Sequence, residues 1–452
     1  MRHTCFRDCA AVAFLVTASV MSAQEPGRVR FETYALPNGL KVILSEDHAA
    51  QVVAVDIWYN VGSRNERSGR TGFAHLFEHM MFQGSANVKK SEHFQLVERA
   101  GGQLNGSTTE DRTNYFETLP SNRINLGLWL EADRMRSLAV TDSNFHNQRE
   151  AVKEERRLRV DNQPYTRAFF EDQYALADSS SCFPYAHSVI GSMADLNAAT
   201  TDDVKGFFRQ YYAPNNATLV VVGDFDPADT KRLIEAYFGG IARVNDIPPV
   251  SACEPRYHGG AIRRPLVDAK ATLPATMQAY RIPAYDHPDT PALVLLSTIL
   301  GQGESSRLTR KLERETKASA GTQVFLHIIG PRRGPNVFAA FAVANQGVGV
   351  DSLDRLLAME FARLASDGVS AEELQKAKNT YKANAIDARQ HAFSIAEALQ
   401  TANLFNGDAD AINTDPGRYD AVTIDDIKRV ARAYLVPDNS LTVLFTPPGT
   451  TP

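Results

Sequence analysis

The sequence has few cysteines and no long apolar run. Only four of its 452 residues are cysteines, and two of them, Cys5 and Cys9, lie within the first ten residues. The remaining two, Cys182 and Cys253, could pair in an oxidising compartment or stay as free thiols, but two cysteines are not a disulfide framework in a chain this long. The apolar run near the N-terminus is shorter than the roughly 20 residues of a membrane span, so we expect no span in the mature chain.

An excess of positive charge is also missing. The formal net charge is -5 and the chain has no basic run, so nothing favours nucleic acid or a strongly charged membrane surface as a partner. With 43% hydrophobic and 22% charged residues, the composition is that of a globular protein. The length is sufficient for two domains of about 200 residues each.

The N-terminus has the pattern of an export signal. Arg2 and Arg7 precede an apolar run over residues 10–18, and small residues follow up to Ala23 before a polar turn. We therefore expect a signal peptide over residues 1–23, cleaved after Ala23, and a location in a bacterial periplasm. The alternative is an uncleaved tether.

One short motif stands out, His75-Leu76-Phe77-Glu78-His79. On a helix, residues four apart lie on one face, so His75 and His79 can direct their imidazoles to one point with Glu78 beside them. This order of residues is that of the inverzincin metalloproteases. The alternative is a core helix whose histidines match the motif by chance.

The segments around this motif alternate between strand and helix patterns. Asn38-Gly39 between apolar runs predicts a β-hairpin. We expect strands over residues 51–59, 103–109 and 113–119, and helices over the motif and over residues 91–100, 122–138 and 143–161.

The chain contains an internal repeat. A helix beginning Thr201-Asp202-Asp203, a Pro-Asn turn and a closing strand at residues 218–222 recur 223 residues later, from Ile424 to Phe445. We therefore expect an α+β fold of two homologous domains, each a mostly antiparallel sheet packed with helices. The expected domains are residues 30–243 and 260–448, with a proline-rich linker over residues 244–259. The second half has no metal motif.

With these features, the sequence resembles the pitrilysin superfamily of zinc peptidases, in particular its short members similar to the mitochondrial processing peptidase subunits and to bacterial two-chain periplasmic relatives. The resemblance rests on residues 36–40, 72–84, 101–105, 212–216, 223–224 and 305–308. It covers nearly all of the mature chain.

The resemblance implies a zinc-dependent endopeptidase with one zinc ion per chain. It implies that His75 and His79 bind the metal and that Glu78 is the general base. A third ligand is implied about 75 residues downstream, where family spacing selects Glu155. The position of Glu155 three residues after Val152 agrees, because both can share an inward face, whereas Glu150 and Glu154 are interpreted as part of a solvated charged face.

The resemblance also implies that a peptide substrate binds as an added strand along Asn105, Gly106 and Ser107. Main-chain hydrogen bonds from an edge strand hold extended peptides of any sequence. Phe82 is a candidate wall of a side-chain pocket, with core packing as the alternative.

Two departures from the family pattern matter. Many members carry a glutamate seven residues before the third ligand, where this chain has Gln148. Members active alone or as homodimers present an arginine and a tyrosine from a stretch that matches Leu312–Thr322 here, and this stretch has no tyrosine. We therefore expect a heterodimer, in which a homologous subunit without the metal motif supplies the arginine and tyrosine and closes the other half of a clamshell. The alternative is a non-catalytic peptide-binding or scaffold subunit.

Overall fold

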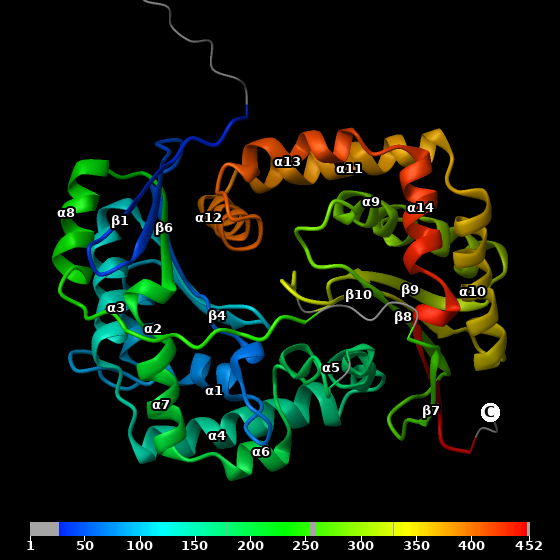
Figure 1. Ribbon diagram of the computed structural model, residues 1–452, viewed down its shortest axis with the longest axis horizontal. Coiled ribbons are helices and arrows are strands. Elements are labelled where there is room, and N and C mark those ends of the chain that lie inside the picture. Colours follow the sequence, from blue (N-terminus) through cyan, green and yellow to red (C-terminus); the bar gives the residue numbers. More distant parts are fainter. Residues whose placement is uncertain (1–26, 178, 254–258, 329, 450–452) are drawn as a thin grey trace, which may run out of the picture.

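The computed structural model describes residues 27–177, 179–253, 259–328 and 330–449. The expected signal peptide, residues 1–23, lies outside these ranges. Two sheets, each packed with helices, form the molecule (Figure 1). Among the helices in the described ranges, none combines the length and apolar character needed to cross a membrane.

The first sheet has six strands in the order β1-β2-β6-β3-β5-β4. They are β1 (Glu32–Ala35), β2 (Lys41–Glu46), β3 (Val52–Tyr59), β4 (Gln103–Thr108), β5 (Thr113–Pro120) and β6 (Ala217–Gly223). All neighbours are antiparallel except β2 and β6. The hairpin predicted at Asn38-Gly39 is confirmed as the β1–β2 connection.

The second sheet repeats this topology with five strands in the order β7-β11-β8-β10-β9. They are β7 (Ile262–Val267), β8 (Ala275–Ile282), β9 (Ser319–Leu326), β10 (Asn336–Ala344) and β11 (Ser440–Thr446). Here too one pair is parallel, β7 with β11, in the position of β2 with β6. The matched order confirms the expected α+β fold of two homologous halves.

Helices follow the strands in both halves. The first half contains α1 (Phe73–Met80), α2 (Glu92–Arg99), α3 (Ile124–Ser137), α4 (Asp142–Arg156), α5 (Thr166–Phe170), α6 (Met193–Ala198), α7 (Thr201–Tyr211) and α8 (Pro227–Phe238). The second contains α9 (Thr290–Gly301), α10 (Val350–Asp367), α11 (Ala371–Ala388), α12 (Ala392–Thr401), α13 (Ala411–Asp420) and α14 (Ile424–Tyr434). The predicted helix over residues 143–161 ends its α-helical part at Arg156 and continues to Asp161 as a wider π-helical turn.

The repeat is visible in the caps of two helices. Thr200 accepts a hydrogen bond from the N–H of Asp203 at the start of α7, and Asp203 reaches back to the N–H of Thr200. Thr423 and Asp426 make the same reciprocal pair at the start of α14. Because each pair satisfies N–H groups that a helix leaves free, the two copies begin their helices by the same chemistry.

Each sheet is partly covered by a helix from the other half of the sequence. Ile395, Ala396 and Leu399 of α12 pack on buried residues of the first sheet, whereas Ala168 of α5 packs on the second. In Figure 1, α12 lies beside the strands of the first sheet and α5 below those of the second.

Polar contacts also join the halves near the β4–β5 turn. Arg332, between β9 and β10, donates to the Glu110 carboxylate over 2.6 Å, and both side chains are buried. The N–H of Arg333 donates to Asp111 over 3.0 Å. These contacts hold the β4–β5 turn against the second half.

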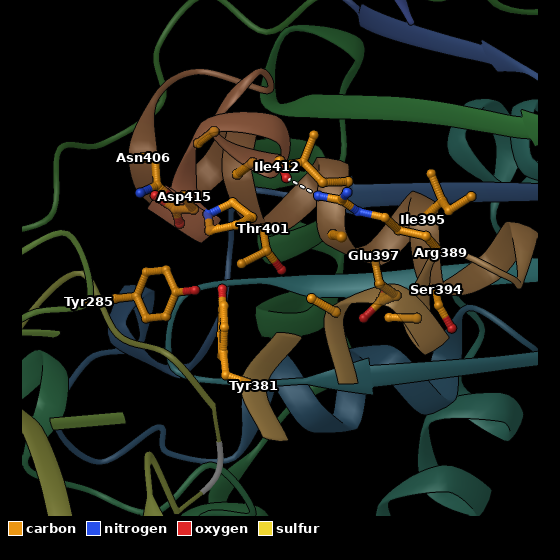
Figure 2. Close-up of a pocket in the computed structure, with 16 residues that line it drawn as sticks. Tyr285, Tyr381, Arg389, Ser394, Ile395, Glu397, Thr401, Asn406, Ile412 and Asp415 are labelled. Atoms are coloured by element: carbon orange, nitrogen blue, oxygen red, sulfur yellow. Dashed lines mark hydrogen bonds between the residues drawn. The ribbon is translucent and has the colours of Figure 1, made fainter. Parts of the chain in front are cut away.

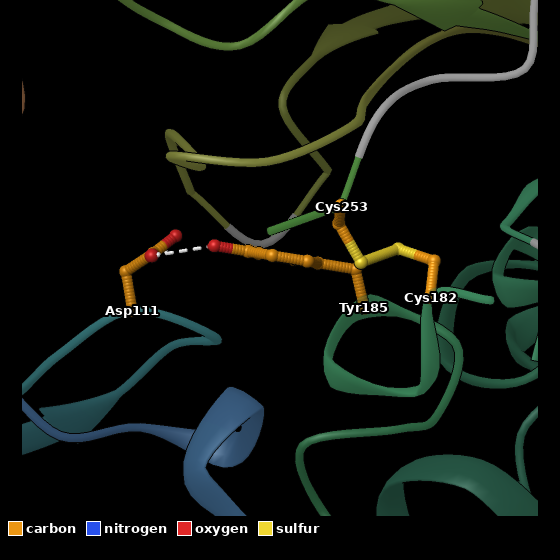
Figure 3. Close-up of a disulfide and its surroundings, with 4 residues drawn as sticks. All are labelled: Asp111, Cys182, Tyr185 and Cys253. Atoms are coloured by element: carbon orange, nitrogen blue, oxygen red, sulfur yellow. Dashed lines mark hydrogen bonds between the residues drawn. A yellow bond between two sulfur atoms is a disulfide. The ribbon is translucent and has the colours of Figure 1, made fainter. Parts of the chain in front are cut away.

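A disulfide joins Cys182 to Cys253 (Figure 3). Next to it, the hydroxyl of Tyr185 donates to Asp111 over 2.8 Å. The disulfide resolves the pairing that the sequence left open. It attaches Cys253, within the connection between the sheets, to the first half close to the β4–β5 turn.

Candidate metal centre

Helix α1 presents both histidines because its other face is packed into the core. Phe73, Ala74, Leu76, Phe77 and Met80 are all buried. His75 and His79, four residues apart, emerge on one side with ring centroids 4.9 Å apart. The motif is therefore on a helix, as predicted, and its apolar residues form the packed face.

Two features fix the start of α1, namely the side chain of Glu66 and the backbone conformation of Gly72. The buried carboxylate of Glu66 accepts hydrogen bonds from the N–H groups of Gly72 and Ala74, over 2.9 and 2.7 Å. It thus occupies the end of the helix where N–H groups are free and negative charge is favoured. Gly72 has a φ of +86°, and a Cβ there would lie 2.8 Å from the carbonyl oxygen of Ile190. Only glycine fits this entry.

The side chain of Glu155 on α4 reaches the same point as the two histidines. Its Oε2 lies 3.6 Å from His75 Nε2 and 3.2 Å from His79 Nε2. One ligand atom from each of the three residues lies within 4.8 Å of the other two. Two imidazoles and one carboxylate suit zinc and leave its fourth position open for water. The donor set and spacing thus fit a zinc ion.

The charges of these groups also suit a metal. Burial lowers the pKa of His75 to about 4, so this imidazole is neutral at neutral pH. Burial acts in the same direction on His79, but the hydrogen bond with Glu155 and the charge of Glu78 raise its pKa overall. Although burial opposes it, the hydrogen bond from His79 brings the pKa of Glu155 down to about 2. The carboxylate is therefore ionised.

The other two glutamates of the α4 segment lie elsewhere. Glu150 pairs with Lys153 over 2.8 Å, and Glu154 pairs with Arg157 over 2.9 Å. Both glutamates are exposed. Their positions agree with a solvated charged face.

Glu78 lies on the cavity side of α1 and is held by the neighbouring strand. The hydroxyl of Thr108 on β4 donates to Glu78 Oε2 over 2.6 Å. Burial raises the pKa of Glu78, while this hydrogen bond opposes the rise. A carboxylate whose pKa is moved toward neutrality is suited to accept and return a proton.

A cavity of about 540 Å³ opens over these residues. It is lined by His75, Glu78, His79, Phe82, Gln83, Phe94, Asn105, Gly106, Ser107, Thr108, Gln148, Glu155 and Arg159. All the predicted site residues are in this set. Within the described ranges the C-terminal half contributes none of the lining residues.

The edge strand β4 forms one side of the cavity. The N–H of Gly106 donates to the side chain of its neighbour Asn105 over 2.9 Å. A Cβ at Gly106 would lie 3.1 Å from a ring carbon of Tyr115 on the neighbouring strand β5, so a larger residue would crowd that ring. The hydroxyl of Ser107 donates a hydrogen bond to the side chain of Asn114 on β5 over 2.7 Å.

Phe82 is both packed and part of the cavity wall. It is only 7% exposed, and its ring centroid lies 4.9 Å from that of Phe94, which is 38% exposed. The Arg134 guanidinium lies 5.2 Å from the centre of the Phe82 ring on another side. Phe82 therefore packs in the core and also lines the cavity.

A second group of metal-type side chains lies behind Phe82. His93, Glu117 and Glu131 are fully buried and close together. However, Arg134 donates to both glutamates, and His93 Nε2 lies 3.0 Å from Glu117. Because a guanidinium already supplies the positive charge, this group is a buried ion-pair network.

A separate cavity of about 320 Å³ lies among α11, α12 and α13 (Figure 2). Figure 2 shows the hydroxyls of Tyr285 and Tyr381 pointing toward one another across it. Arg389 at its wall donates to the carbonyl of Ile412 over 2.7 Å. None of its lining residues belongs to the metal cavity.

Residues 312–322, the stretch without a tyrosine, form the end of a wide helical turn and the start of β9. Its arginine, Arg314, is paired with Glu304. Glu313 accepts hydrogen bonds from the N–H and the hydroxyl of Thr322, over 2.8 and 2.6 Å. These side chains are engaged within their own half.

Four cavity residues were not singled out in the sequence, namely Gln83, Phe94, Thr108 and Arg159. Thr108 is two residues after Gly106 on one strand face, but its bond to Glu78 depends on how β4 lies against α1. Arg159 follows Glu155 by four residues, a spacing that places both on one helix face. Gln148, which stands where many family members have a glutamate, lines the cavity and hydrogen-bonds with His79.

Comparisons with known proteins identify the family. Residues 41–178 match the family model "Insulinase (Peptidase family M16)", and residues 198–381 match "Peptidase M16 inactive domain". The zinc protease PqqE of Helicobacter pylori is 31% identical over 441 residues, 96% of each chain. The mitochondrial-processing peptidase subunit beta of Lentinula edodes is 24% identical, covering 89% of this chain and 87% of its own. A solved protease from Helicobacter pylori has a TM-score of 0.86 at 29% identity and covers 93% of this chain and 100% of its own. The chain therefore belongs to the M16 peptidases, the insulinase and pitrilysin family of zinc proteases.

Proposed function

We propose that this protein is a zinc-dependent endopeptidase that hydrolyses peptides or unfolded segments, with His75, His79 and Glu155 holding one zinc ion. The observation that carries the proposal is the convergence of these three side chains beside Glu78 in one cavity. We assign the metal site to a domain of residues 30–243. A linker over residues 244–259 joins it to a homologous domain over residues 260–448.

Glu78 is the proposed general base. Zinc in such a site acts as a Lewis acid and lowers the pKa of water toward neutrality. Glu78 takes a proton from the attacking water and passes it to the leaving amine. Its raised pKa and the hydrogen bond from Thr108 support this role. The reaction then needs no covalent intermediate.

The peptide binds along the free edge of β4, at Asn105, Gly106 and Ser107. This strand is the last in its sheet, so one side of its backbone is unpaired. The Asn105 side chain, which covers the N–H of Gly106, moves aside when a peptide takes its place. Phe82, together with Phe94, forms an apolar wall for a substrate side chain.

The proposed active form is a heterodimer. The partner is a homologous subunit without the metal motif that contributes the arginine and tyrosine and closes the clamshell. Two observations support this arrangement: the cavity is lined by N-terminal residues, and the stretch 312–322 has no tyrosine. One relative is itself named as a subunit, that of a mitochondrial-processing peptidase.

We propose that the chain is exported to the periplasm. The charged and apolar pattern of residues 1–23 and the Cys182–Cys253 disulfide support an oxidising compartment. The Escherichia coli protein PqqL, which is described as a periplasmic protease, has the same fold with a TM-score of 0.73 at 19% identity.

A peptide assay tests the proposed activity. The chain is purified with candidate homologous subunits, and peptide cleavage is followed with and without a chelator. Cleavage that is lost with the chelator and in Glu78→Gln, while the variant keeps its zinc, is the expected result. Peptide binding with no cleavage by any combination would instead favour the non-catalytic subunit.

A further inference from the structure

Arg159 is the one arginine or lysine among the residues that line the metal cavity in the described ranges. It lies in the wide helical turn that follows α4, and its side chain is 68% exposed. Its Nε lies 3.1 Å from Glu155 Oε1. The two oxygens of Glu155 therefore face different groups, since Oε2 faces the histidines.

The contact with Glu155 leaves most of the guanidinium available. An arginine has five N–H donors in a planar fork that matches a carboxylate, and among the residues that the structure describes only the Nε of Arg159 is engaged in an ion pair. A metal ion bound to Glu155 would also attract the negative charge of this carboxylate. The carboxylate of Glu155 would then neutralise less of the positive charge of Arg159, which lies at the edge of the cavity where a peptide enters.

We propose that Arg159 is a specificity-determining residue that favours peptides with an aspartate or glutamate side chain close to the scissile bond. This inference rests on the proposed function. Arg159 binds the substrate carboxylate through its free N–H groups, while Glu155 remains turned toward the metal. The gain is that of a partly solvated ion pair, which corresponds to about a two- to fivefold preference.

The same turn provides a matched control. Arg157 pairs with Glu154 over 2.9 Å, and both side chains are about half exposed, at 45% and 56%. Arg157 does not line the cavity. Its substitution changes the charge of the chain as much as a substitution of Arg159, but not inside the metal cavity.

The test measures peptide binding to the zinc-loaded Glu78→Gln chain combined with its homologous subunit, because the proposed site needs both subunits and this variant binds without cleaving. A neutral host peptide carries Glu, Gln or Lys at each position near the scissile bond, and binding is followed by fluorescence anisotropy. The ratio of Glu to Gln affinities is compared among Arg159, Arg159→Gln, Arg159→Glu and Arg157→Glu backgrounds. Because each ratio is taken within one variant, a general loss of affinity cancels.

We expect the Glu peptide to bind about two- to fivefold more tightly than the Gln peptide at one or more positions, and less so at high salt. Arg159→Gln removes the preference, Arg159→Glu transfers it to the Lys peptide, and Arg157→Glu leaves it unchanged. The inference is overturned if Arg159→Gln keeps the preference for the Glu peptide. It is also overturned if the only effect of Arg159→Gln is a loss of zinc, which would assign Arg159 to holding Glu155. If no peptide binds, the proposed function itself is contradicted. Binding without any charge preference contradicts only the role of Arg159.

Discussion

Glu78 and Thr108 are 30 residues apart in sequence, yet the second determines where the carboxylate of the first lies. The 2.6 Å hydrogen bond holds Glu78 Oε2 against strand β4, next to the strand edge where we place the peptide. A general base must stay within hydrogen-bond reach of the proton it accepts. Thr108 is thus a positioning residue, because it acts through Glu78.

Removal of this hydroxyl tests that role. In Thr108→Val the shape is kept and the hydrogen bond is lost, so we expect kcat to fall about tenfold, a part of the contribution of a general base. KM should change little. Thr108→Ser should restore most of the activity, since its hydroxyl can make the same bond. Equal kcat values for Thr108→Val and the unchanged protein would contradict the positioning role of Thr108.

The charge of His79 predicts how zinc binding depends on pH. Burial lowers the pKa of His79, but the contacts with Glu155 and Glu78 outweigh it, so in the metal-free protein the ring stays protonated to a higher pH than an ordinary histidine. Zinc must then displace one proton, and its affinity should fall about tenfold for each pH unit below that pKa and level off above it. His75, with a pKa of about 4, adds to this loss only in stronger acid. Competition with a chelator across this range measures the slope, and a flat profile would contradict the assignment of His79 as a ligand.

At the scale of elements, the β4–β5 hairpin connects the metal site to the C-terminal half. One end of it carries Thr108, and its turn carries Glu110 and Asp111. The turn is held by Arg332 and Arg333 from the loop between β9 and β10. The domain without a metal motif therefore stabilises the strand that supports Glu78.

Breaking the buried pair should show this dependence. Arg332→Met leaves the Glu110 carboxylate buried without its cation, although the hydroxyl of Tyr174 still donates to it over 3.0 Å. We expect this change to lower the free energy of unfolding by about 3–5 kcal/mol. Arg232→Met breaks an exposed ion pair with Asp229 and should cost less than about 1 kcal/mol. Denaturant unfolding of both variants measures the difference. Equal effects would show that the Arg332 contact does not secure the hairpin.

The helices and strands of the site were largely predictable, because their patterns are local. Expected boundaries agree with α3 and β5 within about two residues, and the repeated helix starts at Thr201 and Ile424 were visible as such. The exchange of α5 and α12 was not predictable, since an apolar helix face does not specify which sheet it covers. For the same reason the contact between Thr108 and Glu78 depended on how a strand and a helix pack.

At the scale of the molecule, the metal cavity is built by one half of the chain. The model described as an inactive domain matches residues 198–381, from the last part of the first half into α11 of the second. The second half contacts the β4–β5 turn but contributes no lining residue of the cavity in the described ranges. The three residues that we propose as metal ligands could be named from the motif and the resemblance, and the structure brings their side chains together. The disulfide could not, because two cysteines 71 residues apart reveal nothing about their distance in space.

An incomplete site predicts low activity for the isolated chain. Donors that stabilise the developing charge on the scissile carbonyl contribute about 10²–10³ in kcat. We therefore expect the chain alone to cleave peptides at least about 10²-fold more slowly than the chain combined with its homologous subunit. Full activity of the purified monomer would contradict the two-chain proposal.

The central claim is that His75, His79 and Glu155 together hold one zinc ion. The most direct measurement is the zinc content of purified variants, determined by mass spectrometry of the metal. We predict about one zinc per chain for the unchanged protein and for Glu154→Ala, and little zinc for His75→Ala, His79→Ala and Glu155→Ala. Loss of zinc in His75→Ala but full retention in Glu155→Ala would contradict the account.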